Sequence, residues 1–378
     1  MNAKTTKVCD YLLNYVSSDA VGVGTLLPPE TDLATQFDVS RMNAHAAMKV
    51  LERHGVVYSR RGAGTFVSKK PSLSLIRHLK GLSVKRAHVV VGFEPIPLHW
   101  TDETLSQLEE LLSESGFVVE YVQIPTPLTH ESLEAMLKKI TEEGSSALVL
   151  ILPREAGLFC EKNAGLIFQY HRNIFLFDRG DIPPGSWPFH VISLDPFAEG
   201  VLSAQYVYDK GYRRAVFWSP FAEEGKYWDS QRASGFVLGM QRASGGILNP
   251  EILKFEGQEG AAQVCKHLLD SDGDCAVVTV NDQAAVWLKE AAEIQNLHAP
   301  RDFGLLGFDD NPQFRHSNLS TVAPPLAGIG GILARAISGS LLPTDEFSSF
   351  VLRLPSRIID RGSCVLPKSS NALAGKPS

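Results

Sequence analysis

Residues 25–67 read TLLPPETDLATQFDVSRMNAHAAMKVLERHGVVYSRRGAGTFV, and this stretch decides the N-terminal fold. The pattern predicts a helix over about 30–37, a tight turn at Asp38 and Val39, and a second helix that begins after Ser40, a preferred N-cap residue. Gly55 ends that helix, and residues 56–60 and 65–68 alternate as two short strands around RGAG. Together with an earlier helix over about 5–17, these elements predict three helices followed by a hairpin.

The helix after Ser40 has two faces of opposite character. Apolar residues recur along it at the spacing of one buried face: Ala44, Ala47, Met48 and Leu51. The other face is polar and carries Arg41, Asn43, His45 and Lys49. Two short helices joined by a tight turn, with polar side chains at the start of the second, are typical of a helix-turn-helix, and the hairpin adds a wing.

Several of these side chains suit contacts with DNA. Arg41 can donate two hydrogen bonds to guanine O6 and N7, and Asn43 can pair with adenine or reach a phosphate. His45 is as well explained by a surface position as by a groove contact. Gly64, at the wing tip, lacks a Cβ and can approach a narrow minor groove, while basic residues beside it can neutralise phosphates. The candidate DNA contacts are Arg41, Asn43, His45, Lys49, Arg60, Arg61 and Gly64.

The charges of the chain are unevenly distributed. The 378 residues carry a net charge of -6, but residues 1–86 contain thirteen Lys and Arg against six Asp and Glu, a balance of +7. The rest of the chain therefore carries -13. A basic head on an acidic body is expected when one domain meets a polyanion, although a solvated basic face is the plainer alternative.

Cysteine usage and hydropathy indicate the compartment. The five cysteines are scattered without a CxxC or a His-spaced cluster, so neither a disulfide framework nor a metal site is expected. The N-terminus lacks the apolar core of a signal peptide, and no run of 18 apolar residues occurs. We expect a cytoplasmic protein with no membrane contact.

From residue 87 onward, short apolar runs alternate with amphipathic helical stretches as far as Phe308. Such alternation predicts an α/β fold with parallel sheets covered on both faces. About ten such strand–helix units are more than one sheet readily accommodates, and their number therefore favours two doubly wound lobes. We therefore expect a winged helix-turn-helix over 1–70, a linker over 71–86, a two-lobed domain over 87–362 and a flexible tail over 363–378.

Ligands of doubly wound folds bind outside the carboxyl ends of the strands, which here predicts a site between the lobes. Carboxylate, amide and guanidinium groups beside aromatic rings suit a sugar or polyol. Asp178 can equally cap a helix, and Trp218 can equally belong to the core. The candidate ligand contacts at these strand ends and on the following helix are Phe93, Glu94, Asp178, Trp218, Arg232, Asn281 and Asp309.

Two sets of motifs resemble known families. LPPE at 27–30, VSR at 39–41 and RGAGTFV at 61–67 resemble the winged helix-turn-helix of GntR-type bacterial regulators. Thr31 and His45 depart from that pattern, because an arginine is common at both positions, and the resemblance therefore implies an unusual operator. Arg41 and Gly64 match the pattern.

The second set lies in the body. RASGF at 232–236, VNDQAA at 280–285 and GFDD at 307–310 resemble the effector domain of LacI/GalR-type repressors, which is similar to periplasmic sugar-binding proteins. This resemblance implies that Arg232, Asn281 and Asp309 contact the ligand. A GntR-type head on such a body is similar to the arabinose repressor group.

These patterns predict a bacterial transcription regulator, most simply a repressor, that binds operator DNA as a homodimer and responds to a small carbohydrate effector. The alternative is a sugar-binding protein without DNA function, which would need an export signal and no wing. An enzyme is not expected, because no G-x-S-x-G, P-loop, HExxH or dinucleotide fingerprint occurs. No cofactor is expected either.

Overall fold

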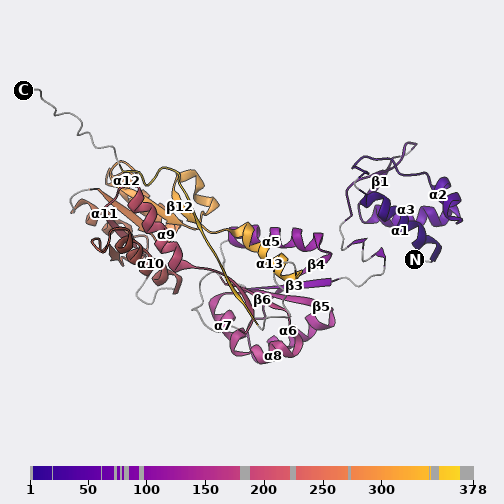
Figure 1. Cartoon of the computed structure of the whole chain (residues 1–378), viewed down its shortest axis with the longest axis horizontal. Helices are drawn as coiled ribbons and strands as arrows, with labels where there is room; N and C mark the ends of the chain where they lie inside the picture. The colour runs from indigo at the N-terminus through magenta and orange to yellow at the C-terminus, as the bar shows by residue number, and fades with distance from the viewer. Residues whose placement is uncertain are drawn as a thin grey trace, which may run out of the picture.

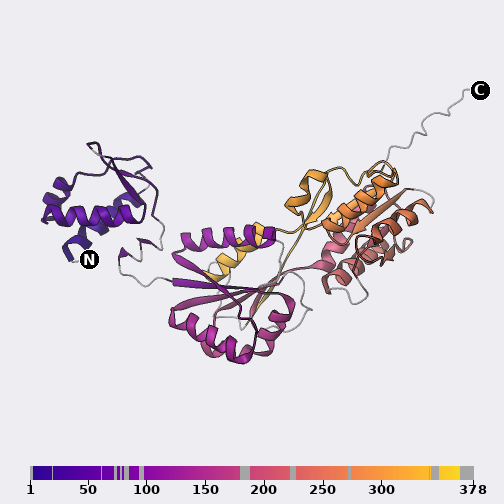
Figure 2. The ribbon, with the colours of Figure 1, turned by 180° about the vertical axis from the view of Figure 1, so that it is seen from behind.

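The computed structural model consists of a small N-terminal domain, called the head, and two larger lobes (Figure 1). It describes residues 3–18, 20–60, 62–71, 75–76, 79–80, 85–92, 98–178, 188–221, 227–270, 274–339, 341 and 349–366. The view from behind in Figure 2 shows the same three parts in a row, with lobe 1 between the head and lobe 2.

The head contains the predicted winged helix-turn-helix. Its elements are α1 (Ala3–Ser17), α2 (Glu30–Phe37), α3 (Arg41–Arg53), β1 (Val57–Arg60) and β2 (Gly64–Val67), the two strands pairing antiparallel. The Ser40 side chain accepts a hydrogen bond from the backbone N–H of Asn43 and so caps α3 as predicted. Leu12, Leu33, Leu51 and Val67 are fully buried in a core shared by all these elements.

The head extends beyond its predicted boundary. Leu75, Ile76 and Leu79 pack against the head core, and the Lys80 ammonium donates a hydrogen bond of 2.8 Å to the side-chain oxygen of Asn14. The next domain begins with β3 at Lys85. The predicted linker over 71–86 is therefore wrong at both ends, because apolar residues within it find a partner surface on the head.

Lobe 1 is built on a six-stranded, wholly parallel sheet of order β13-β7-β6-β5-β3-β4. Helices cover both of its faces, as the apolar runs predicted: α5 and α13 lie on one face, and α6, α7 and α8 on the other (Figure 1). The elements are β3 (Lys85–Val91), α5 (Leu98–Glu114), β4 (Phe117–Gln123), α6 (His130–Glu142), β5 (Ser145–Ile151), α7 (Arg154–Lys162), α8 (Ala164–Tyr170), β6 (Ile174–Asp178), β7 (His190–Leu194), α13 (Leu326–Ile337) and β13 (Val351–Leu354).

Lobe 2 has a second six-stranded sheet of order β14-β12-β11-β10-β8-β9, parallel except for β14. Its elements are α9 (Pro196–Asp209), β8 (Arg214–Trp218), α10 (Tyr227–Ala243), β9 (Glu251–Leu253), α11 (Gly260–Leu269), β10 (Cys275–Thr279), α12 (Asp282–Ile294), β11 (Gly304–Phe308), the 3-10 helix η1 (Pro312–Ser317), β12 (Ser320–Ala323) and β14 (Arg357–Ile359).

The chain crosses between the lobes three times, from β7 to α9, from β12 to α13 and from β13 to β14. Apolar alternation predicted two lobes, but it did not predict that α13 and β13 return to lobe 1. The predicted start of the flexible tail, at residue 363, is also too early. Ser363 and Cys364 are buried in lobe 2, and the Ser363 hydroxyl donates a hydrogen bond of 2.6 Å to the carbonyl of Leu305.

A glycine contact sets the distance between α9 and α10. A Cβ on Gly235 would lie 2.1 Å from the carbonyl oxygen of Phe197, and a Cβ on Gly200 would lie 2.1 Å from that of Arg232. Because backbone atoms occupy both spaces, no side-chain rotation could relieve the clash. This close approach fixes the position of α10 and therefore of Arg232, which belongs to the site described below.

We therefore expect Gly235→Ala to lower the free energy of unfolding by about 3 kcal/mol, the upper end of typical overpacking costs. Urea unfolding followed by tryptophan fluorescence measures the change. Gly165→Ala is the matched control, because Gly165 lies in α8 with open space around it. The control should be neutral or more stable by up to about 1 kcal/mol, as alanine favours helix. Equal effects of the two substitutions would contradict the close packing.

Candidate functional site

The exposed face of α3 carries the predicted cations. The Arg41 and Lys49 side chains are 73% and 50% exposed. Glu30, the first residue of α2, accepts from both neighbours on this face: its carboxylate lies 3.4 Å from Arg41 Nε and 2.7 Å from His45 Nδ1. Arg41, His45 and Lys49 therefore share one surface that is open to a large polyanion.

Two predicted DNA contacts have a different role. The Asn43 side-chain oxygen accepts a hydrogen bond of 3.2 Å from the hydroxyl of Thr5, which is buried on α1. The half-buried Asn43 therefore joins α3 to α1, and its contact with DNA stays a prediction. Gly64 has a φ of +112°, and a Cβ there would lie 2.6 Å from Leu26. The backbone conformation thus favours glycine at this position, and the end of the Leu26 side chain would have to move to admit a Cβ.

Arg60 is exposed at the end of β1, next to the wing tip. Arg61 lies outside the described residues, as do Phe93 and Glu94 of the predicted ligand site. Thr31, which departs from the GntR-type sequence pattern, lies on α2. Its side chain is exposed, and its hydroxyl donates a hydrogen bond to Asp32.

At the carboxyl edge of the lobe 2 sheet, Arg232 of α10 holds several elements together. Its guanidinium donates hydrogen bonds of 2.9 Å to Glu199 on α9, 2.8 Å to the Val280 carbonyl and 2.9 Å to Asp309. It also lies 4.5 Å from the centroid of the Phe308 ring. Burial lowers the pKa of Arg232, but the adjacent carboxylates outweigh burial and raise it, so the group stays charged.

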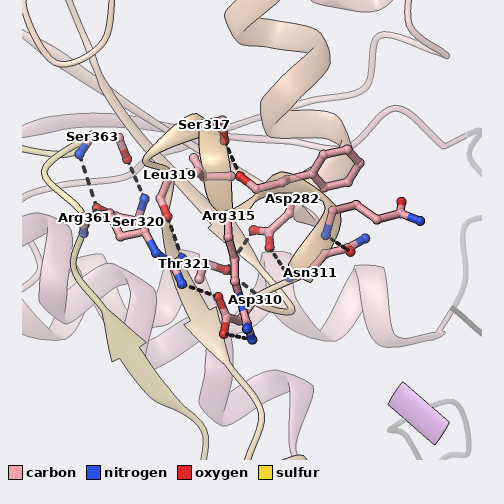
Figure 3. Close-up of polar contacts among 12 residues, drawn as sticks. Asp282, Asp310, Asn311, Arg315, Ser317, Leu319, Ser320, Thr321, Arg361 and Ser363 are labelled. Carbon is pink, nitrogen blue, oxygen red and sulfur yellow. Dashed lines mark hydrogen bonds and ion pairs between the residues drawn. The ribbon is translucent and has the colours of Figure 1, made fainter. Parts of the chain in front are cut away.

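Asp309 is presented by a loop in an uncommon backbone conformation. Asp309 and Asp310 both have positive φ, 100° and 50°, which costs free energy for residues other than glycine. Side chains behind the loop hold it in place (Figure 3). Asp282 accepts hydrogen bonds of 2.8 Å from the Thr321 hydroxyl and from the backbone N–H of Asn311.

The C-terminal segment supports the same loop. The Arg361 guanidinium donates hydrogen bonds of 2.5 Å to the Asp310 carboxylate and 2.9 Å to the Leu319 carbonyl, and Arg315 donates to Asp310 from the other side (Figure 3). Asp310 is thus occupied by two arginines, while Asp309 faces Arg232. Side chains on both sides of the loop therefore hold it in this conformation.

Asn281 and Asp178 occupy the predicted strand ends. Asn281 caps α12 by accepting a hydrogen bond of 2.9 Å from the backbone N–H of Ala284, and its side chain is half-buried. Asp178 ends β6 of lobe 1, is 7% exposed, and accepts from the Ser193 hydroxyl at 2.9 Å. Both residues lie at carboxyl edges, where the fold places ligands.

The start of α10 in lobe 2 lies near the end of β6 in lobe 1. Burial raises the pKa of Tyr227, the charge of Arg353 lowers it, and the charges of Asp178 and Asp195 raise it further. Arg353 belongs to β13 and donates to Asp195 at 3.1 Å. The charges of Arg353, Asp178 and Asp195 therefore act on Tyr227 at the junction.

Trp218 does not line the predicted ligand site. It is fully buried in the core of lobe 2, and its indole N–H donates a hydrogen bond of 3.0 Å to the carbonyl of Phe255. The apolar strand that ends at Trp218 is buried on both faces, which explains why this side chain has no path to the edge.

Sequence reasoning missed two buried carboxylates next to the site. Glu199 is 3% exposed and pairs with Arg232, and its position one turn into α9 is the only signal in the sequence. Asp229 is fully buried in α10 and accepts hydrogen bonds from Ser219 at 2.8 Å and from Lys254 at 2.9 Å.

Within the described part of the chain, no group of three or more His, Cys, Asp or Glu side chains could hold a metal ion, and no helix is long and apolar enough to span a membrane. The five cysteines are buried and unpaired.

The titration of Asp282 provides a test of the loop geometry. Burial, and after it the charge of Asp309, raises the pKa of Asp282 from its ordinary value of 3.8 to about 8. Folding therefore favours the protonated carboxyl. This contribution to stability is complete below pH 3.8 and is lost as the pH rises through about 8.

We expect the free energy of unfolding of the native sequence to fall between pH 6 and pH 9, and to fall less for Asp282→Asn, which is neutral throughout. Urea unfolding at each pH measures both slopes. Parallel slopes for the two proteins would contradict the burial of this carboxyl beside Asp309.

Comparison with protein families separates the chain into two parts. Residues 4–67 match the family described as bacterial regulatory proteins, gntR family, and residues 204–364 match the periplasmic binding protein-like domain. The first match coincides with the head as far as β2, and the second runs from α9 to the buried C-terminal segment.

Two similar proteins are arabinose metabolism transcriptional repressors. The repressor of Geobacillus stearothermophilus is 23% identical over 310 residues, covering 79% of this chain and 80% of its own length. That of Halalkalibacterium halodurans is 22% identical over 296 residues, covering 75% and 74%. Both alignments therefore extend through most of each chain.

Solved structures show the same fold. A LacI family transcriptional regulator from Enterococcus faecium with bound ribose has a TM-score of 0.53 at 20% identity, covering 74% of this chain and 99% of its own. The complex of the transcriptional regulator CelR with cellobiose has a TM-score of 0.54 at 16% identity, covering 89% and 100%. The chain therefore joins a DNA-binding domain of the bacterial gntR regulatory family to a periplasmic binding protein-like domain.

Proposed function

We propose that this protein is a transcriptional repressor whose affinity for operator DNA is controlled by a small carbohydrate bound at the carboxyl edges of the two lobes. The observation that carries the proposal is the presence in one chain of an exposed cationic recognition helix and, in the body, a preorganised frame of Arg232, Asp309 and Asn281. The similarity to arabinose repressors supports it.

On the DNA side, α3 is the element that enters the major groove. Arg41 is the first residue of α3, where side chains of a recognition helix reach base edges. When it leaves Glu30, its guanidinium has the geometry for guanine. Lys49 and Arg60 then neutralise phosphates on either side, and such contacts make binding salt-dependent.

On the effector side, the chemistry favours a neutral polyhydroxy compound. Asp309 and Asn281 can accept or donate to hydroxyl groups, while Arg232 is held in place by Glu199 and the Val280 carbonyl. Asp178 supplies a further carboxylate from lobe 1. The ribose and cellobiose in the two neighbouring structures are members of this chemical class.

Coupling between the two functions requires the lobes to move. We infer that an effector held by both lobes closes them, and that two bodies paired as a homodimer then change the spacing of their heads against a pseudo-palindromic operator. A coupling of about 1–3 kcal/mol would change operator affinity about 5- to 150-fold. A repressor of this kind works in the cytoplasm.

A sugar-binding protein without DNA function remains the second candidate, and the Arg232 frame alone would suit it. The exposed Arg41 and Lys49 distinguish the two, because a solute-binding protein has no use for them. The decisive measurement is DNA binding.

We expect Arg41→Ala to weaken binding to the operator by about 5- to 140-fold, because one bidentate guanine contact is worth about 1–3 kcal/mol. Electrophoretic mobility shift with the promoter of the neighbouring genes, at two salt concentrations, measures the loss. Arg301→Ala is the matched control, since Arg301 is an exposed arginine of lobe 2 paired with Asp302. Binding that is insensitive to salt, or equal for both variants, would refute the proposed DNA contact.

We expect Asp309→Asn to reduce effector affinity at least tenfold, because one carboxylate oxygen pairs with Arg232 and the substitution replaces the charged group by a neutral amide with one acceptor oxygen. Isothermal titration calorimetry with L-arabinose, D-ribose and cellobiose identifies the effector and measures the change. This substitution keeps the buried Arg232–Glu199 pair intact, which Arg232→Ala would not.

Asp302→Asn, an exposed substitution on the opposite edge of the same sheet, is the control for that titration. Unchanged affinity in Asp309→Asn would show that the effector binds elsewhere.

A further inference from the structure

The centre of the exposed face of α3 is a methionine. Met42 is 82% exposed, more than any other large apolar side chain of the described head. The buried residues of α3 define one side of the helix: Ala44, Ala47, Met48 and Leu51. At 3.6 residues per turn, Met42 lies opposite the middle of that buried stripe.

The charged side chains around Met42 already have partners. Arg41 and His45, on the side of α3 that faces α2, converge on the carboxylate of Glu30. Lys49 pairs with Glu52 one turn further along α3. Met42 is therefore an apolar side chain in the middle of a cationic face, at the second position of the helix.

Burying this side chain against DNA would be favourable, because its apolar surface would be removed from water. Transfer of apolar surface out of water is favourable by about 0.8 kcal/mol per methyl or methylene group. An unbranched thioether is also adaptable, because its three side-chain torsions let it follow an irregular surface. Met42 has no hydrogen bond to offer to a base edge or to a phosphate.

We propose that Met42 reads the C5 methyl group of a thymine in each operator half-site. Thymine is the base that displays a methyl group in the major groove, and apolar side chains recognise it there. First-turn residues of a recognition helix lie at the base edges, so Met42 and Arg41 would contact neighbouring base pairs. This inference rests on the proposed repressor function and adds to it a specificity-determining residue.

The test begins with selection of binding sites by the full-length protein from a random duplex library. Each thymine of the selected half-site is then replaced by deoxyuridine, which removes only the C5 methyl. We expect one replacement to weaken binding of the native protein about fourfold per half-site, the equivalent of about 0.8 kcal/mol. The Met42→Ala protein should bind the thymine and deoxyuridine duplexes equally.

Lys49→Ala is the matched control, because a phosphate contact does not depend on the methyl group. It should weaken binding to both duplexes and leave their fourfold ratio unchanged. Met42→Gln, similar in length but polar, should lose the ratio like Met42→Ala and provides the measurement if the alanine variant binds too weakly.

The outcomes separate this inference from the proposed function. If the native protein selects a sequence but no thymine in it is sensitive to deoxyuridine, or if Met42→Ala keeps the fourfold ratio, the role of Met42 is refuted and the repressor proposal stands. If the native protein selects no sequence, the DNA-binding function itself fails.

Discussion

A single buried cation organises the body of this protein. Removing a guanidinium from water is costly unless carboxylates and carbonyls replace the lost hydration, and Arg232 of α10 obtains both from three other parts of the chain. That requirement brings α9, α10, the end of β10 and the loop after β11 to one point. The positions of Glu199 and Asp309 at the carboxyl edge of lobe 2 follow from it.

The same edge depends on parts of the chain that are remote in sequence. Ser356, between β13 and β14, donates a hydrogen bond of 2.6 Å to Glu199, and Arg361 braces the Asp310 carboxylate. Three crossings between the lobes bring these segments back to the site. A ligand held between Asp309 and lobe 1 would therefore lie close to the segments that connect the lobes.

The head follows a different physical logic. Its fold needs only local order: a capped α3, an apolar stripe on that helix and glycines where the backbone must take positive φ. These features are short-range, and so they were predictable from residues 25–67. The division of polar residues on α3 was not, because Asn43 faces Thr5 of α1, a contact between residues 38 positions apart.

The sequence by itself determined the winged helix-turn-helix, the two parallel sheets, the positions of Asn281 and Asp309 at strand ends and that of Arg232 on the helix after Trp218, since periodicity and turn chemistry are local properties. Tertiary structure alone decided that Trp218 is core, that Leu75, Ile76 and Leu79 pack against the head, and that α13 and β13 return to lobe 1. It also revealed Glu199 as the partner of Arg232 and Met42 as the centre of the exposed face. The reason is that burial and charge pairing depend on which distant segments meet, and no spacing along the chain records that.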